Sequence, residues 1–154
     1  MVLVDRKIRD LVDSENLIIN YNESRLNSIS YDVVIDKFIL DNKEIDMEEY
    51  ILSRNSFVYV KTLESLNMMN DLCCVVIEKN SLMRNGLKVD GPLYQPGHKT
   101  NIFLRVLNIS NSDIILKKDM EIAQLIFMKL SDVPDNTYDM QNDSRYNNED
   151  VFRG

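Results

Sequence analysis

Apolar residues in this chain recur mainly in short runs, many of them with the two-residue period of a β-strand. In one such run Tyr31, Val33 and Ile35 fall on one side, with Asp32 and Asp36 among the residues of the other. This alternation predicts a strand with one face against the core. Further apolar runs of strand length lie at Leu17–Ile19, Phe57–Lys61, Leu72–Ile77 and Ile102–Asn108. Many short strands with little helix indicate an all-β sandwich or barrel.

Helical periodicity is confined to the N-terminus. There Ile8, Leu11 and Val12 form one apolar face, and Asp5 stands where it can cap a short helix. The acidic, polar stretch Asp41–Glu49 is predicted to be a loop.

Turn residues separate the later strands. Asp90-Gly91-Pro92 marks a tight turn. Asp113–Leu116 and Glu121–Leu130 are predicted to pair as a hairpin around Lys117-Lys118-Asp119.

The last residues change in character. Positions 131–154 are rich in Asn, Asp and Ser, with only scattered apolar side chains such as Tyr138, Tyr146 and Phe152. We therefore expect one β domain over residues 1–130, followed by a flexible tail, residues 131–154, that orders on another surface.

Composition narrows the class of protein. The chain has 154 residues, 44% of them hydrophobic and 28% charged, as expected for one domain with a proper core. Its net charge of −7 argues against binding a nucleic-acid polymer, which normally requires a basic face. No apolar run is long enough to span a bilayer, and the N-terminus lacks the pattern of a signal peptide, so we expect no membrane partner and a cytoplasmic location.

Cysteine and histidine are too few for a zinc site. Cys73 and Cys74 are adjacent in an apolar run, so on a strand they point to opposite faces and are expected to be buried thiols. His98 is the only histidine. This excludes zinc-dependent deamination, which needs protein-held zinc, but not a metal ion carried by the phosphates of a substrate.

The segment Glu78–Leu87 is the strongest candidate for chemistry. It predicts a strand that ends in a helical turn closed by Gly86, with Asn80 or Ser81 as the cap. Backbone N–H groups, a hydroxyl and the Arg84 guanidinium would then lie together, which suits phosphate oxygens. The alternative is a solvated corner between a strand and a helix.

The run Asn80-Ser81-Leu82-Met83-Arg84-Asn85-Gly86 resembles the Ser-Ser-Leu-Ala-Arg-x-Gly motif of the trimeric dUTPase and dCTP deaminase superfamily, which binds a triphosphate there. Asparagine replaces the first serine, and methionine replaces the alanine. Further pieces similar to the family follow its order, over about residues 3–150: Asp5–Leu11, Ser30–Val33, Thr62–Leu66, Met120–Phe127 and Ser144–Glu149.

The resemblance implies a distorted β-barrel or jelly roll with a short N-terminal helix, forming a homotrimer with nucleotide sites between subunits. The implied ligand is a deoxyribonucleoside triphosphate with Mg²⁺ carried on its phosphates and no metal held by the protein alone. The tail element is expected to fold over the triphosphate, with Arg145 in place of a family lysine. The residues expected to bind nucleotide are Lys79, Asn80, Ser81, Arg84, Tyr94, Arg105, Gln124, Arg145 and Tyr146.

The catalytic positions of the family are changed. The glutamate that acts as the base in the deaminases aligns with Arg105, and arginine stays protonated, so it cannot take a proton from water. The aspartate that orients water in the dUTPases aligns with Gln95, whose amide can position water but is a very weak base. Asp90 is the nearest carboxylate, as a replacement base or as a plain turn residue. Tyr94 stacks on a sugar or base, or belongs to the core.

Three functions follow from these residues. The first is a dCTP deaminase-like or dUTPase-like enzyme that hydrolyses dUTP or dCTP, with Asp90 and Gln95 at the reacting centre. The second is an inactive homologue that senses or sequesters a nucleotide. The third is a protein-interaction module on the same trimeric scaffold.

Overall fold

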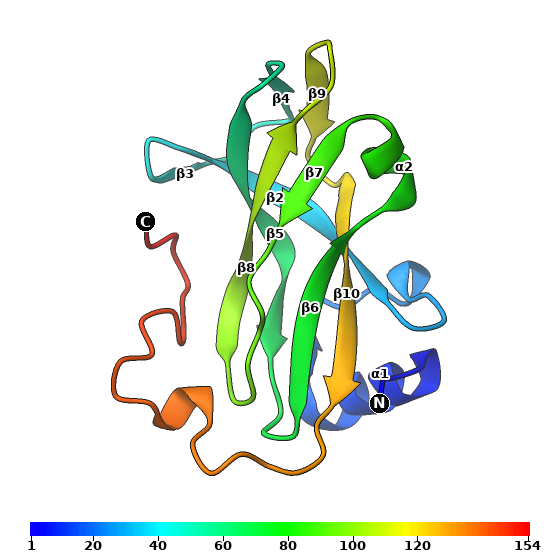
Figure 1. The fold of residues 1–154 in the computed structure, drawn as a ribbon, viewed down its shortest axis with the longest axis vertical. Coiled ribbons are helices and arrows are strands. Elements are labelled where there is room, and N and C mark those ends of the chain that lie inside the picture. The colour runs from blue at the N-terminus through cyan, green and yellow to red at the C-terminus, as the bar shows by residue number, and fades with distance from the viewer.

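The fold is a nearly closed β-barrel with one short helix at its side and a C-terminal segment that runs back along the outside (Figure 1). The computed structural model describes all residues, 1–154. Its helices are α1 (Asp5–Glu15) and α2 (Asn80–Arg84), with 3₁₀ turns η1 (Glu23–Arg25) and η2 (Tyr138–Met140). Its strands are β1 (Ile18–Ile19), β2 (Tyr31–Leu40), β3 (Lys43–Ile45), β4 (Glu49–Leu52), β5 (Phe57–Asn67), β6 (Leu72–Glu78), β7 (Leu87–Asp90), β8 (Lys99–Asn108), β9 (Ile114–Lys117) and β10 (Glu121–Lys129).

The main sheet has the strand order β6-β10-β2-β5-β8-β7, with β1 paired to β5 and β3 paired to β2. Its two edge strands, β6 and β7, almost close the sheet into a barrel. Cys74 on β6 and Tyr94 after β7 exchange backbone hydrogen bonds of 2.9 Å in each direction. The main chain therefore wraps most of the way around the core. No helix is long and apolar enough to cross a membrane.

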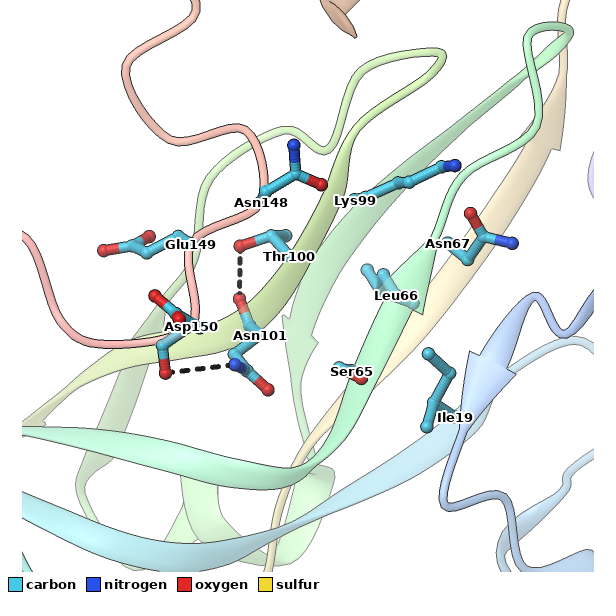
Figure 2. A pocket seen from close by; sticks show the side chains of 10 residues that line it. All are labelled: Ile19, Ser65, Leu66, Asn67, Lys99, Thr100, Asn101, Asn148, Glu149 and Asp150. Carbon is cyan, nitrogen blue, oxygen red and sulfur yellow. Dashed lines mark hydrogen bonds between the residues drawn. The ribbon is translucent and has the colours of Figure 1, made fainter.

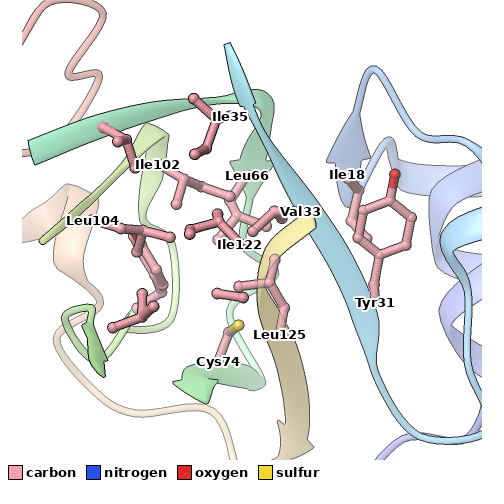
Figure 3. Close-up of a cluster of buried hydrophobic side chains, with 14 of the residues drawn as sticks. Ile18, Tyr31, Val33, Ile35, Leu66, Cys74, Ile102, Leu104, Ile122 and Leu125 are labelled. Carbon is pink, nitrogen blue, oxygen red and sulfur yellow. The ribbon is translucent and has the colours of Figure 1, made fainter. Parts of the chain in front are cut away.

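The core sits where the strands converge. Figure 3 shows Ile35, Leu66, Ile102, Leu104 and Ile122 pointing toward one another, and all five are essentially inaccessible. β8, predicted as an apolar run, alternates buried and more exposed positions. β2 differs from the prediction of one buried face, because all of its first five residues are buried, including the carboxylate of Asp32.

The N-terminal helix forms as predicted, and Ile8 is its buried residue. Its cap was predicted wrongly. Val4 occupies the N-cap position, and Asp5 is the first helical residue, whose carboxylate accepts a hydrogen bond of 2.7 Å from the N–H of Arg6.

Two predicted connections are corrected. The stretch 41–49 is not only loop, because it contains β3, which forms a hairpin with β2 through Asp41 and Asn42 at φ 50° and 61°. Consecutive Asp and Asn residues with positive φ are a typical signal of a two-residue hairpin turn. The predicted hairpin of β9 with β10 does not form: β9 pairs with β4, and β10 pairs with β2 and β6. Periodicity does not reveal such non-local pairing.

The C-terminal segment lies against the barrel. After η2 it passes beside β8, where Glu149 forms a parallel bridge with Thr100. Figure 2 shows Asn148, Glu149 and Asp150 alongside Thr100 and Asn101.

Candidate functional site

The helical turn α2 forms the corner that the sequence singles out. It begins directly after β6, and Lys79 is its N-cap residue, with no hydrogen bond from a side chain to the turn. The prediction that Asn80 or Ser81 caps the turn is therefore wrong: the Asn80 carboxamide instead accepts a hydrogen bond of 3.0 Å from Arg84 Nε. Ser81 and Arg84 are exposed at this corner. It thus presents a hydroxyl and a guanidinium to solvent.

Lys79 fastens the start of α2 to two strands. Its ammonium group donates to Asp32 Oδ2 on β2 at 2.5 Å and to the carboxylate of Glu121 on β10. Burial opposes the charge of Lys79, but these hydrogen bonds raise its pKa, and the same contact lowers the pKa of Glu121. Lys79 is thus held at the start of α2 with its charge balanced by two carboxylates. Asp32 Oδ1 is buried without a hydrogen-bond partner.

Gln124 also helps to hold the strand end that leads into α2. It lies opposite Asp32 in the pairing of β10 with β2. Its amide donates to the Glu78 carbonyl at 3.1 Å, and its oxygen accepts from the Ser30 hydroxyl at 3.0 Å. Both ends of the side chain are therefore engaged within the chain.

The end of α2 is held by close packing. Gly86 has φ +82°, and a Cβ there would lie 2.6 Å from Ser110 Cβ. Ser110 in turn donates to Asn108 Oδ1 through its N–H at 3.0 Å and its hydroxyl at 2.7 Å. Only glycine combines this backbone conformation with so close an approach.

A second part of the site is a cavity of about 230 Å³ between the 92–98 loop, β8 and the tail. The 92–98 loop and the beginning of β8, which line it, lie toward the opposite end of the barrel from α2 (Figure 1). No lysine or arginine lines it. The lining residues are Pro92, Leu93, Tyr94, Gln95, His98, Thr100, Asn101, Phe103, Tyr138, Tyr146 and Glu149.

Aromatic side chains form much of the cavity wall. Tyr94 is 2% exposed, and its ring lies 5.7 Å from that of His98, which lies 4.2 Å from the ring of Tyr138. Tyr94 is thus part of the core and of the cavity wall at once. Gln95 is exposed at the rim.

His98 and Glu149 are the titratable side chains of the cavity wall whose pKa values are shifted. His98 Nε2 lies 2.9 Å from the Tyr146 carbonyl, so it carries the proton, and Nδ1 is left buried without a partner. Burial lowers the pKa of His98 and raises that of Glu149. Sequence reasoning considered His98 only as a zinc ligand and missed Glu149, because their meeting depends on how the tail folds back.

Arg105 on β8 and Asp90 on β7 lie opposite each other where the two strands pair. Arg105 donates to Asp90 Oδ2 from Nη2 at 2.8 Å and from Nε at 3.2 Å, and Lys88 donates to Oδ1 at 2.8 Å. Hydrogen bonds from Lys88 and Arg105 lower the pKa of Asp90. A carboxylate held this way is a weaker base than a free one.

The remaining expected residues lie in the tail. Arg145 donates to the Gly154 carbonyl at 2.5 Å and lies over the Tyr146 ring, with 5.4 Å from Cζ to the centroid. The structure thus places Arg145 and Tyr146 beside the cavity end and not at α2. No group of three or more His, Cys, Asp or Glu side chains is arranged to hold a metal ion.

Comparison with known proteins identifies the family. A family model described as dCTP deaminase-like matches residues 33–130. The dCTP deaminase of Pyrococcus horikoshii is 29% identical over 142 residues, which is 90% of this chain and 88% of that protein.

Solved structures share the fold. The dCTP deaminase of Agrobacterium tumefaciens has a TM-score of 0.70 at 15% identity, covering 82% of this chain, which spans 47% of the length of that protein. A dUTPase from phage phi11 of S. aureus, described as coordinating a structural Mg(II) ion, has a TM-score of 0.58 at 11% identity over 86% of this chain and 91% of that one. The chain belongs to the dCTP deaminase-like family.

Proposed function

We propose that this protein binds a pyrimidine deoxyribonucleoside triphosphate and does not deaminate it. The observation that carries the proposal is the ion pair of Arg105 and Asp90. The position expected to hold a glutamate base holds an arginine instead, and its guanidinium engages the nearest carboxylate. The α2 corner, by contrast, keeps Ser81 and Arg84 exposed.

The two parts of the site suit different parts of a nucleotide. The α2 corner offers the Ser81 hydroxyl and the Arg84 guanidinium to phosphate oxygens. The cavity offers aromatic rings and one unpaired acceptor, His98 Nδ1, without a cation, which suits a planar base and not a phosphate. Because they lie near opposite ends of one chain (Figure 1), one nucleotide would use the α2 of one subunit and the cavity of another, as in a homotrimer.

A phosphate-borne Mg²⁺ fits one feature of the corner. Mg²⁺ prefers oxygen ligands, and Asp32 Oδ1 is a carboxylate oxygen that nothing in the chain engages. Asp32 would hold the ion, directly or through a water molecule, together with phosphate oxygens. When bound, the ion neutralises phosphate charge and polarises phosphorus toward attack by water.

That fit makes hydrolysis of dUTP or dCTP the second candidate function. Gln95 would then orient water at the cavity rim, with Asp90 as the base if it leaves Arg105.

Calorimetry combined with product analysis separates these functions. Pure protein is titrated with dCTP, dUTP, dTTP and dATP in the presence of Mg²⁺, and the mixtures are then analysed for uridine nucleotides, ammonia and pyrophosphate. The proposal expects saturable binding of a pyrimidine nucleotide, with no uridine product from dCTP. Ammonia from dCTP would contradict it. Pyrophosphate or inorganic phosphate would establish the second candidate, and absence of any binding would reject both.

A further inference from the structure

The strands β4 and β9 form a small sheet of their own beside the main sheet, and one of its faces is open to solvent. Within it Glu49 lies opposite Lys117. Ile51 lies opposite Ile115 in the same way. Because side chains two residues apart on a strand share a face, these four side chains lie together and are here called the β4–β9 face. Figure 1 shows β4 and β9 side by side at the top of the barrel.

The opposite face of this small sheet belongs to the core. Leu52 and Leu116 are inaccessible to solvent, and Tyr50 packs against the core cluster. On the β4–β9 face, by contrast, Ile51 is 59% and Ile115 49% exposed. The sheet therefore presents two adjacent isoleucine side chains to solvent, with no element of the same chain over them.

The charges next to these isoleucines are unpaired in the chain. Glu44 and Lys118, which lie nearby in sequence, form ion pairs with Lys61 and Asp46. Glu49 and Lys117 are exposed and form no ion pair, although their Cα atoms are partners in the sheet. The β4–β9 face thus carries one negative and one positive charge at the same level of its two strands.

A second copy of this chain complements the β4–β9 face. A two-fold axis parallel to the strands lays β4 of one copy over β9 of the other, at the same level. Each Glu49 then faces a Lys117, and the contact occurs twice because such an interface is isologous. Each Ile51 faces an Ile115 in the same manner. A two-fold axis across the strands would instead set each charge against an isoleucine or against its own kind.

We propose that the β4–β9 face joins two copies of this chain about a two-fold axis parallel to its strands. The isoleucines exclude water at the centre of the contact, and the facing Glu49 and Lys117 side chains at its rim fix the orientation. The face is small beside a standard protein interface, so the pairing is reversible and depends on protein concentration. It is independent of the proposed nucleotide binding.

The mass of the protein in solution tests this pairing. Sedimentation velocity and light scattering follow the protein without nucleotide over concentrations from micromolar to millimolar. At the upper end, wild type should approach twice the mass of Ile51→Asp, whether that variant is a single chain or a trimer, because pairing would bury an uncompensated carboxylate. Ile29→Asp, the same change at a 48% exposed site before β2, should reach the wild-type mass.

Three results of this comparison would overturn the proposal. One is an equal mass of wild type and Ile51→Asp at every concentration. Another is a mass ratio of three, which would place the β4–β9 face in a ring of three copies. The third is an equal loss of mass in Ile29→Asp, which would remove the role of this face.

Charge reversal tests which side chains face each other. Glu49→Lys sets two positive charges against each other across the contact, and Lys117→Glu sets two negative ones, so each variant alone should lose the doubling. An equal mixture of the two variants restores opposite charges at both contacts and should regain it. No recovery in the mixture would overturn the two-fold arrangement. Urea unfolding with the wild-type midpoint shows that each variant remains folded. Failure of nucleotides to bind would reject the proposed function but leave these masses to decide the pairing.

Discussion

At the scale of single residues, the chemistry open to this chain depends on which charges are already paired. The sequence alone shows that Arg105 cannot act as a base, because this follows from the residue type. It does not show that Arg105 holds Asp90, because that contact requires the Asp90–Arg105 register of β7 with β8. The same limit applies to Lys79, whose two carboxylate partners come from strands distant in sequence.

His98 provides a prediction at this scale. Burial lowers its pKa below the ordinary value of 6.5, despite the opposing hydrogen bond to Tyr146. In the unfolded chain the ring takes up a proton near that value, while in the folded chain it stays neutral. The unfolded state thus binds more protons, so this residue lowers the free energy of unfolding as pH falls from about 6.5 toward the folded pKa.

NMR titration of the single imidazole ring measures this pKa, and urea unfolding at about pH 5.5 and about pH 7.5 measures its effect. His98→Gln should lose this part of the pH dependence and keep the contributions of the carboxylates. A ring that titrates at or above the ordinary value would contradict the burial argument.

At the scale of elements, local patterns located most strands and the N-terminal helix. Alternation locates β2, although not its burial on both faces, and the apolar runs after positions 71 and 101 mark β6 and β8. Pairing was harder to predict. The Lys117–Asp119 turn does not close a hairpin because its backbone bonds elsewhere: the Lys118 N–H donates to the Glu48 carbonyl at 2.8 Å, and the Asp119 N–H to that of Ile35 at 2.8 Å.

The α2 corner was found from the sequence, but its supports were not. Gly86 was recognised as the residue that closes the turn, whereas its contact with Ser110 comes from the segment after β8. The cavity could not be predicted either, because one wall is the 92–98 loop and the other is the tail, which folds back from a distant part of the sequence.

Gly86→Ala tests how tightly the corner is held. The new Cβ would meet Ser110 at 2.6 Å in a backbone conformation that side chains rarely adopt. We expect a loss of about 1–3 kcal/mol in the free energy of unfolding and weaker triphosphate binding, because α2 must shift. Urea unfolding and calorimetry measure the two effects, with Met83→Ala, at a 56% exposed site on the same turn, as the control. Wild-type stability and affinity in Gly86→Ala would show that the close approach is unimportant.

At the scale of the whole molecule, the barrel separates the α2 corner from the aromatic cavity. The α2 corner and the elements that line the aromatic cavity lie near opposite ends of the barrel (Figure 1), so a nucleotide that uses both would need two subunits. Family membership was predictable from motifs spread along the sequence. That the tail would lie on β8 of its own chain, with Arg145 far from α2, was not, because its polar sequence lacks a periodic pattern.

The central claim is that the α2 corner binds the triphosphate of a nucleotide. Calorimetry with Mg²⁺ and the pyrimidine nucleotide that binds wild type tests it most directly, comparing Arg84→Ala with Arg54→Ala, which removes the same exposed charge from the loop between β4 and β5. We expect Arg84→Ala to weaken binding roughly ten- to a hundredfold, as loss of a charge-assisted hydrogen bond implies, and Arg54→Ala to bind like wild type. Unchanged affinity in Arg84→Ala, or an equal loss in both variants, would contradict the account.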